Sequence, residues 1–200
     1  MRPTFHLIAG PNGAGKTTFY EQYLRARTNA PFVNPDLLAR EVLGRWSNSA
    51  EDAVLGQNLA SARRAALIAA GQSLVMESTF SHPSKLDLIE QVIAAGYRLA
   101  VYHLSVVDAD FAVERVVDRE ALGGHPVPDA KVRGRYDRNG PVIRSAVLRA
   151  DNGFVFDNSI DGAPPRLLIT FQLGRVVQIA SDLPAWAADL YAEDLASSSA

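Results

Sequence analysis

The sequence predicts an α/β fold in which helices cover both faces of a mainly parallel central sheet of about five strands. Short apolar runs alternate along the chain with helical segments, an order that is typical of parallel sheets. The runs are almost continuously apolar, as expected for strands that are buried on both faces. A chain of 200 residues has the usual size of one domain, so we expect residues 1–200 to form a single domain.

The first strand, loop and helix carry the strongest signal. An apolar run over 5–9 predicts a buried strand, and a helix is expected over 17–24. Glycines let successive backbone N–H groups point inward at a phosphate, and the N-terminus of a helix attracts negative charge. This unit predicts the three-layer sandwich of the P-loop NTPases. Between strand and helix, the phosphate-binding pattern G-x-x-x-x-G-K-[ST] is matched at every fixed position by Gly10-Pro11-Asn12-Gly13-Ala14-Gly15-Lys16-Thr17.

The same stretch predicts the residues that bind ATP or GTP. Lys16 is expected to reach the β- and γ-phosphates, and the Thr17 hydroxyl is expected to bind Mg²⁺. The alternative is a glycine-rich turn with an incidental lysine, which the four matched positions and their flanking structure disfavour. The expected nucleotide-binding residues are Gly10, Pro11, Asn12, Gly13, Ala14, Gly15, Lys16, Thr17 and Thr18.

From residue 32 to residue 120, apolar runs predict strands, and capping or turn residues delimit the helices between them. Asp36 is expected to cap the first of these helices, and glycines end the first three. Pro83 begins the third, in the first turn, where proline is tolerated. The predicted strands are 32–36, 73–77 and 98–107. The predicted helices are 37–43, 53–70, 84–95 and 108–120.

Beyond residue 120, two glycines and two prolines predict a loop over 121–128. Pro141 is expected to begin a helix of its own, separate from the one before it. The last two strands are joined by Leu173-Gly174 and are expected to extend the sheet as an antiparallel hairpin. The predicted elements are helices at 131–138, 142–150 and 184–195, a strand at 153–157 and a hairpin at 167–171 and 175–179.

Carboxylates at the ends of two predicted strands are candidates for the chemistry. In an open α/β sheet the ligand lies beyond the carboxyl ends of the strands. Asp36 is a candidate general base that accepts the proton of an acceptor hydroxyl, and a plain helix cap is the alternative. Glu77 could hold the acceptor, order Mg²⁺ through water or be the base, or it could only orient loop donors. Thr79 could bind the substrate or cap a turn.

Two arginine-bearing helices joined by a loop, over about 115–138, predict a lid. Arginines that close over a transferring phosphate offset its developing charge and exclude water. A solvated basic face with ion pairs along each helix is the alternative. His125, in the loop, could contact a phosphate or the acceptor, or be exposed to solvent. The expected lid arginines are Arg115, Arg119, Arg133 and Arg135.

The composition of the chain limits which partners it can be expected to bind and where it is expected to be found. A net charge of −2 implies no general attraction to nucleic acid or to an anionic membrane, so nucleic acid is not expected, although it is not excluded. No apolar run approaches the roughly 18 residues of a membrane span. The chain begins with a strand rather than a leader peptide and has no cysteine, so we expect a cytoplasmic protein.

Taken together, these pieces resemble the zeta-toxin family of P-loop kinases, and in particular its shorter branch of predicted nucleotide kinases or ATPases. The resemblance covers about residues 5–160. Where toxin members have a second arginine before a Thr-Pro pair, this chain has His125 before Pro126. The matching pieces are 10–18, Asn34-Pro35-Asp36-Leu37, Glu77-Ser78-Thr79-Phe80, Glu114-Arg115, 123–128 with 133–136, and Phe156-Asp157-Asn158-Ser159.

The resemblance implies a donor, an acceptor and roles for single residues. ATP or GTP would be the donor, and the 3′-hydroxyl of a UDP-activated amino sugar such as UDP-N-acetylglucosamine would be the acceptor. By the resemblance, Asp36 is the base, and Glu77 and Thr79 contact the sugar. Lys16 and the lid arginine Arg115 are the other catalytic residues that it implies. An inhibitory antitoxin-like protein is the partner to look for.

Two further functions stay open at this point. The acceptor could be another hydroxyl, on a nucleoside, a dinucleotide or a polynucleotide end. Alternatively, the chain could be a nucleotide-switched regulatory ATPase, which needs a residue that activates water and no acceptor pocket. The Glu77-x-Thr79 pair and the predicted lid favour a kinase over such a switch.

Overall fold

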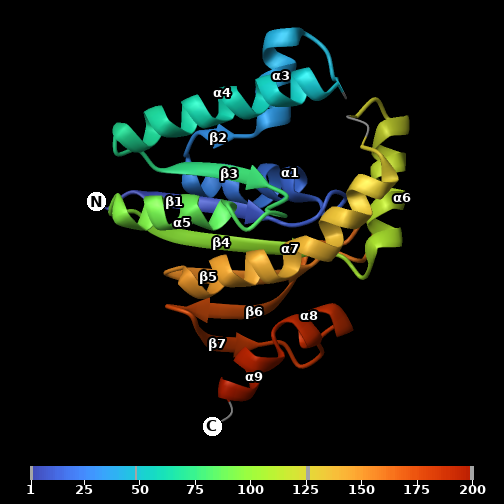
Figure 1. Ribbon diagram of the computed structural model, residues 1–200. Coiled ribbons are helices and arrows are strands. Elements are labelled where there is room, and N and C mark those ends of the chain that lie inside the picture. Colours follow the sequence, from blue (N-terminus) through green and yellow to red (C-terminus); the bar gives the residue numbers. More distant parts are fainter. Residues whose placement is uncertain (1, 48, 125–126, 199–200) are drawn as a thin grey trace.

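The computed structural model, which describes residues 2–47, 49–124 and 127–198, has a seven-stranded sheet with helices on both faces (Figure 1). The predicted α/β class and mainly parallel sheet are confirmed. The strands lie in the order β2-β3-β1-β4-β5-β6-β7; the first five are parallel, and β6 and β7 are antiparallel. The strands are β1 Thr4–Ala9, β2 Phe32–Val33, β3 Leu74–Ser78, β4 Arg98–Ser105, β5 Asn152–Asp157, β6 Arg166–Gln172 and β7 Arg175–Ile179.

Helices lie between the parallel strands and at the C-terminal end. Several begin at side-chain caps, which satisfy backbone N–H groups that the first turn leaves free. The Ser49 hydroxyl accepts from the N–H of Asp52, and the Asp108 carboxylate accepts from that of Phe111. The helices are α1 Lys16–Phe19, the π-helix η1 Tyr20–Leu24, α2 Arg25–Thr28, α3 Pro35–Leu43, α4 Ala50–Ala69, α5 Lys85–Ala94, α6 Ala109–Ala121, α7 Asp129–Arg149, α8 Ala185–Leu190 and α9 Ala192–Ser198.

The start of α3 corrects one prediction. Asn34, rather than Asp36, caps this helix, because its Oδ1 accepts from the N–H groups of both Asp36 and Leu37. Pro35 occupies the first helical position, where its missing N–H costs nothing. Asp36 therefore lies within the first turn, and its exposed carboxylate is not used for capping.

Pro141 does not begin a new helix, as predicted, but lies inside α7, which continues from Asp129 to Arg149. Proline inside a helix costs about 3 kcal/mol, because it removes one backbone hydrogen bond and crowds the preceding turn. Val132 on one side of Pro141, and Val142, Ile143 and Val147 on the other, are all buried. Continuous burial of this helix face outweighs the local cost.

The C-terminal hairpin is confirmed, with Leu173 and Gly174 both at positive φ in its turn, as a tight two-residue hairpin requires. The single predicted helix 184–195 is instead two short helices, α8 and α9. The break falls at Tyr191, whose fully buried side chain anchors this end of the chain against the sheet.

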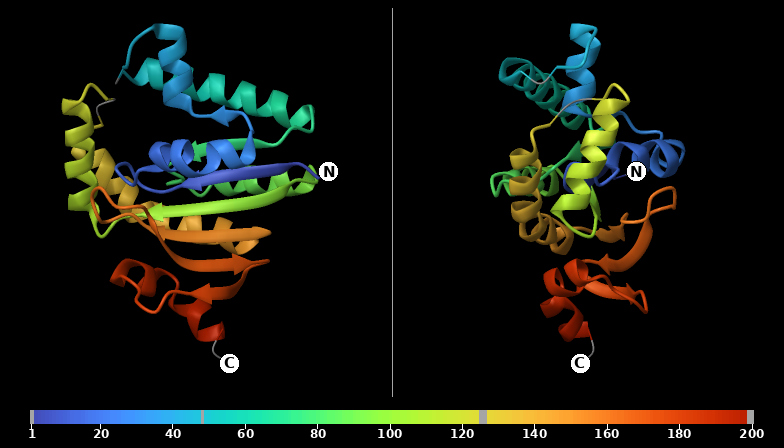
Figure 2. Two further views of the ribbon diagram at one scale, coloured as in Figure 1. Left: turned by 180° about the vertical axis from the view of Figure 1, so that it is seen from behind. Right: turned by 90° about the vertical axis from the view of Figure 1, so that its right-hand side faces the viewer.

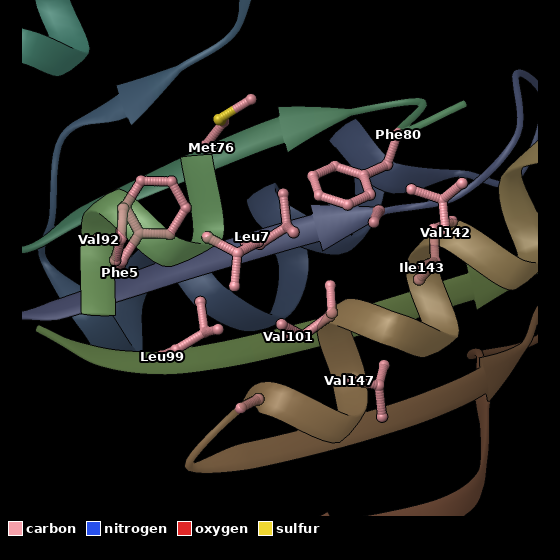
Figure 3. Packing of buried hydrophobic residues seen from close by; sticks show 14 of the residues in the cluster. Phe5, Leu7, Met76, Phe80, Val92, Leu99, Val101, Val142, Ile143 and Val147 are labelled. Atoms are coloured by element: carbon pink, nitrogen blue, oxygen red, sulfur yellow. The ribbon is translucent and has the colours of Figure 1, made fainter. Parts of the chain in front are cut away.

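Two apolar clusters hold the three layers together. α1, η1 and α2 cover one face of the sheet, and α5 and α7 cover the other (Figure 2). On the α5 and α7 side, Phe5 and Leu7 of β1 and Leu99 of β4 face Val92 and Ile143 (Figure 3). These side chains are fully removed from water, so the sheet has a fixed position under the loops at its carboxyl edge. Among the described residues, no helix is both long and apolar enough to cross a membrane.

A buried polar contact joins β4 to the C-terminal segment. His103 Nδ1 lies 2.8 Å from the Tyr191 hydroxyl, and only 1% of the His103 residue is exposed. Burial lowers the pKa of His103 from 6.5 to about 3, because the charged imidazole would be separated from water.

This burial predicts a loss of stability in mild acid. Below pH 6.5 the unfolded state binds a proton at His103 that the folded state excludes, so the free energy of unfolding falls as the pH falls. The expected contribution is about 2 kcal/mol at pH 5. Urea unfolding of the wild type and of each variant at pH 7 and pH 5 measures it as a difference between proteins. His103→Gln is expected to remove this contribution, whereas a replacement of the exposed His82 by Gln keeps it. His6, whose pKa burial lowers from 6.5 to about 4, adds a similar pH effect that remains in His103→Gln. An equal pH effect in His103→Gln would contradict this account.

Candidate active site

A cleft of about 1180 Å³ opens beyond the carboxyl ends of the parallel strands. In Figure 1 these strand ends point toward α6. The floor of the cleft is the loop between β1 and α1 together with the end of β3. Residues of α3 and α4 line one side, and residues of α6, α7 and the segment 158–165 line the other. The cleft is larger than the 300–1,000 Å³ of most single-ligand pockets.

The glycine-rich loop is held by close backbone contacts. A Cβ atom at Gly10 would lie 2.0 Å from the Leu104 carbonyl oxygen, and one at Gly13 would lie 2.4 Å from that of Ala112. Gly13 and Gly15 also have φ angles of 80° and 79°, which side chains rarely adopt. The motif glycines are therefore required by packing against β4 and α6 as well as by the curvature of the loop.

Lys16 lies beneath this loop and is buried. Its Nζ donates to the Pro11 carbonyl oxygen at 2.8 Å, which holds the side chain folded back along the loop. Burial lowers the pKa of Lys16, and the nearby carboxylates of Glu77 and Asp36 act in the opposite direction. The ammonium group thus lies between the loop and the two candidate carboxylates.

Glu77, at the end of β3, connects the loop to the far side of the cleft. Its Oε2 accepts a hydrogen bond from the Thr17 hydroxyl at 2.8 Å and another from Asn34 Nδ2 at 3.0 Å. Asn34 is buried and caps α3 through its other amide atom. One asparagine therefore fixes both the carboxylate and the helix that carries Asp36. The sequence signal for Asn34 was its place directly before Pro35, the first residue of α3.

The other predicted acceptor residues line the same cleft. Asp36 is exposed and lines the cleft. Burial lowers the pKa of the Arg135 guanidinium, and the nearby Asp36 carboxylate acts in the opposite direction. Thr79 follows β3 and lines the cleft beside Glu77. The predicted substrate residue His125 lies outside the described residues. The structure thus brings Asp36, Glu77 and Thr79 together with Lys16 and Thr17.

The predicted lid arginines divide into two groups. Arg115, Arg119 and Arg135 line the cleft. Arg135 Nη1 donates to Asn12 Oδ1 at 3.0 Å, and Arg115 Nη1 donates to the Asn158 carbonyl oxygen at 2.6 Å. Arg133 does not line the cleft, because it forms an exposed ion pair with Asp110. Arg133 therefore belongs to a solvated basic face, which was the alternative to a role in the lid.

Asn158 follows β5 and was not among the predicted site residues. Its Nδ2 donates to the Ala14 carbonyl oxygen at 3.0 Å, and its backbone N–H donates to the Ser105 carbonyl oxygen at 2.8 Å. Its own carbonyl accepts from Arg115, which also pairs with Asp161. Asn158 therefore ties the phosphate-binding loop to the ends of β4 and β5. The cleft also contains three cations that sequence analysis did not select: Arg64, Lys85 and Lys131.

The oxygen atoms around Thr17 suit Mg²⁺. This ion prefers hard oxygen ligands and usually takes one or two from the protein, with water and substrate phosphates supplying the rest. Thr17 Oγ1 and Glu77 Oε2 lie 2.8 Å apart at the floor of the cleft. Among the described residues no cluster of three or more His, Cys, Asp or Glu side chains forms a self-contained metal site. The arrangement thus fits an ion that arrives with a nucleotide.

The chain is similar to one known protein family and to several solved structures. The family model for zeta toxin matches residues 1–139. Among curated proteins, none matches the sequence significantly.

Solved structures match over most of the chain. A crystal structure of the AvrRxo1-ORF1:AvrRxo1-ORF2 complex with sulphate ions has a TM-score of 0.71 at 18% identity, covering 96% of this chain and 63% of that chain. A structure of the same pair with ATP has a TM-score of 0.70 at 19% identity, with the same coverage. This chain thus spans about 63% of the length of the AvrRxo1 chain.

Two other solved structures match, one over nearly all of this chain and one over about two thirds of it. The PezAT toxin–antitoxin system of Streptococcus pneumoniae matches with a TM-score of 0.57 at 14% identity, covering 96% of this chain and 78% of that chain. The Pnkp1/Rnl/Hen1 RNA repair complex matches with a TM-score of 0.57 at 19% identity, covering 68% and 44%. At these identities the likenesses show the fold.

The contact between Asn158 and Ala14 predicts an effect on nucleotide affinity. Asn158→Ala leaves a loop carbonyl without its partner, so the affinity for Mg²⁺ and a non-hydrolysable ATP analogue is expected to fall about 5- to 15-fold, equivalent to roughly 1–1.5 kcal/mol. Isothermal titration calorimetry measures it. Ser159→Ala is the matched control, because Ser159 bonds to Asp157 rather than to the loop. Equal affinities in the two variants would show that Asn158 does not support the loop.

Proposed function

Because the chain belongs to the zeta-toxin family, whose model matches residues 1–139, we propose that it is an ATP- or GTP-dependent kinase of a small molecule. The proposed acceptor is a hydroxyl of a nucleotide-activated sugar such as UDP-N-acetylglucosamine. One observation carries the proposal: a cleft of about 1180 Å³ has a phosphate-binding loop and, at its floor, a glutamate bonded to the loop threonine. This volume leaves room for a second substrate beside the nucleotide.

The donor half is the loop with Lys16 and Thr17. Backbone N–H groups within 12–18 bind the phosphates, because Pro11 has no N–H and that of Gly10 donates to the Ser78 carbonyl oxygen. Lys16 turns from the Pro11 carbonyl oxygen to the β- and γ-phosphates. Thr17 and Glu77 would hold Mg²⁺. When bound, this ion neutralises charge on the β- and γ-phosphate oxygens.

The acceptor half begins at Asp36 and Thr79. We assign Asp36 as the general base, because its carboxylate lies in the cleft and is not needed to cap α3. It accepts the proton of the hydroxyl as the oxygen attacks the γ-phosphorus in line with the leaving ADP. Thr79 and Glu77 orient the acceptor. Both carboxylates are carried by elements that Asn34 joins.

Cations on the opposite side complete the proposed site. Arg115, Arg119 and Arg135 come from α6 and α7 and line the cleft. Positive charge in a partly enclosed site stabilises the transferring phosphoryl group more strongly than it would in water. Arg115 also donates to the Asn158 carbonyl oxygen, and Asn158 in turn donates to the Ala14 carbonyl oxygen of the phosphate-binding loop. The cytoplasm, where ATP and sugar nucleotides occur, is the proposed location. The AvrRxo1 and PezAT structures motivate a proposed inhibitory protein partner.

The assignment of Asp36 predicts a specific loss of transfer. With Mg²⁺-ATP and UDP-N-acetylglucosamine, Asp36→Asn is expected to lower kcat about 10²- to 10⁴-fold, because the asparagine cannot accept the proton. Coupled ADP release and mass detection of the phosphorylated sugar nucleotide measure it. The control Glu41→Gln changes an exposed carboxylate on the same helix, outside the cleft, and keeps the rate.

Two outcomes would change the proposal. If Asp36→Asn retains the wild-type rate, another group is the base. If UDP-N-acetylglucosamine gains no phosphoryl group but a nucleoside, a dinucleotide or a polynucleotide end does, the kinase assignment stands and the acceptor is replaced.

A further inference from the structure

Among the residues that the structure describes, two cations on the α4 and α5 side of the cleft have no acidic partner. Arg64 on α4 and Lys85, the first residue of α5, are both half-buried and both line the cleft. The Arg64 guanidinium donates only to weak acceptors, Met76 Sδ at 3.9 Å and Ser61 Oγ at 3.3 Å. Among the described residues, no ion pair includes either side chain.

This arrangement costs free energy in the unliganded protein. Partial burial lowers the pKa of Arg64 and, together with repulsion from Arg64, that of Lys85. Two like charges near each other, partly removed from water and without a carboxylate, are disfavoured unless an anion joins them. Arg63, the neighbouring arginine on α4, is exposed and avoids this cost. A bound anion would supply the missing partner.

The pair lines the α4 and α5 side of the cleft, and neither cation is among the charges that act on Lys16 of the donor loop. Arg64 contacts Met76 of β3. Lys85 follows the segment that carries Thr79 and Ser81, and both of these also line the cleft. The donor phosphates already have Lys16. Ala53 and Ala60, two small residues of α4, line the cleft together with Arg64.

We propose that Arg64 and Lys85 bind the phosphate groups of the acceptor and so select for a phosphorylated metabolite whose free hydroxyl reaches Asp36. This inference rests on the proposed function and adds to it the two residues that recognise the acceptor phosphate. A phosphate offers oxygens in several directions, which suits two cations on separate helices, whereas a carboxylate is satisfied by one guanidinium. The phosphate could be the diphosphate of a sugar nucleotide or a terminal phosphomonoester.

A binding experiment tests the subsite apart from catalysis. The donor loop is saturated with Mg²⁺ and β,γ-methylene-ATP, and inorganic pyrophosphate or inorganic phosphate is then titrated by calorimetry. The wild type is expected to bind one anion, and the double variant Arg64→Gln/Lys85→Gln is expected to bind it at least tenfold more weakly. Tighter binding of pyrophosphate indicates a diphosphate in the acceptor, and tighter binding of phosphate indicates a phosphomonoester.

The control is Arg63→Gln, which removes an exposed arginine from the same helix and is expected to leave the anion affinity unchanged. Equal affinity in the double variant and the wild type, or no anion binding by the wild type, would overturn the inference. Nucleotide binding is measured first in every variant. A wild type that binds no ATP analogue contradicts the proposed function, and the anion titration without nucleotide still tests the subsite.

Discussion

The position of the phosphate-binding loop depends on how closely its backbone approaches neighbouring strands and helices. At Gly10 a Cβ atom would lie 2.0 Å from the Leu104 carbonyl oxygen, so no larger residue fits between β1 and β4 at this point. Gly13 meets α6 in the same way, and the Asn158 amide bonds to the Ala14 carbonyl oxygen. The loop is therefore shaped before any nucleotide binds. Such preorganisation spares the cost of ordering donors when the phosphates arrive.

Glu77 extends this order across the cleft. One of its oxygens accepts from Thr17 on the donor side and from Asn34 on the acceptor side. Because Asn34 also begins α3, the donor loop and the helix of Asp36 are joined by one short chain of hydrogen bonds. Cations also line the cleft on two sides: Arg119 and Arg135 come from α6 and α7, and Arg64 and Lys85 come from α4 and α5. In the proposed function the first group faces the transferring phosphoryl group and the second faces the acceptor.

Local patterns predicted most of the fold and the residues at the strand ends. The five parallel strands and the hairpin were predictable, since each is an apolar run bounded by turn residues. Lys16 follows from the phosphate-binding pattern, and Asp36 and Glu77 follow from the rule for strand ends. Contacts between residues that are distant in sequence were not predictable. Pro141 stays helical because α7 is buried on both sides of it, and Arg64 faces the cleft because α4 packs against α3 and β2. Neither signal exists in a short segment of sequence.

The fate of the γ-phosphate tests the central claim, that the cleft holds a nucleotide and an acceptor together. The protein is incubated with Mg²⁺ and ATP labelled at the γ-phosphate, together with a bacterial small-molecule extract, and the label is followed by chromatography and mass spectrometry. The account predicts label in an organic metabolite that gains one phosphoryl group, with none when Lys16 is replaced by Ala. Label that appears only in inorganic phosphate, at a rate the extract does not change, would contradict it.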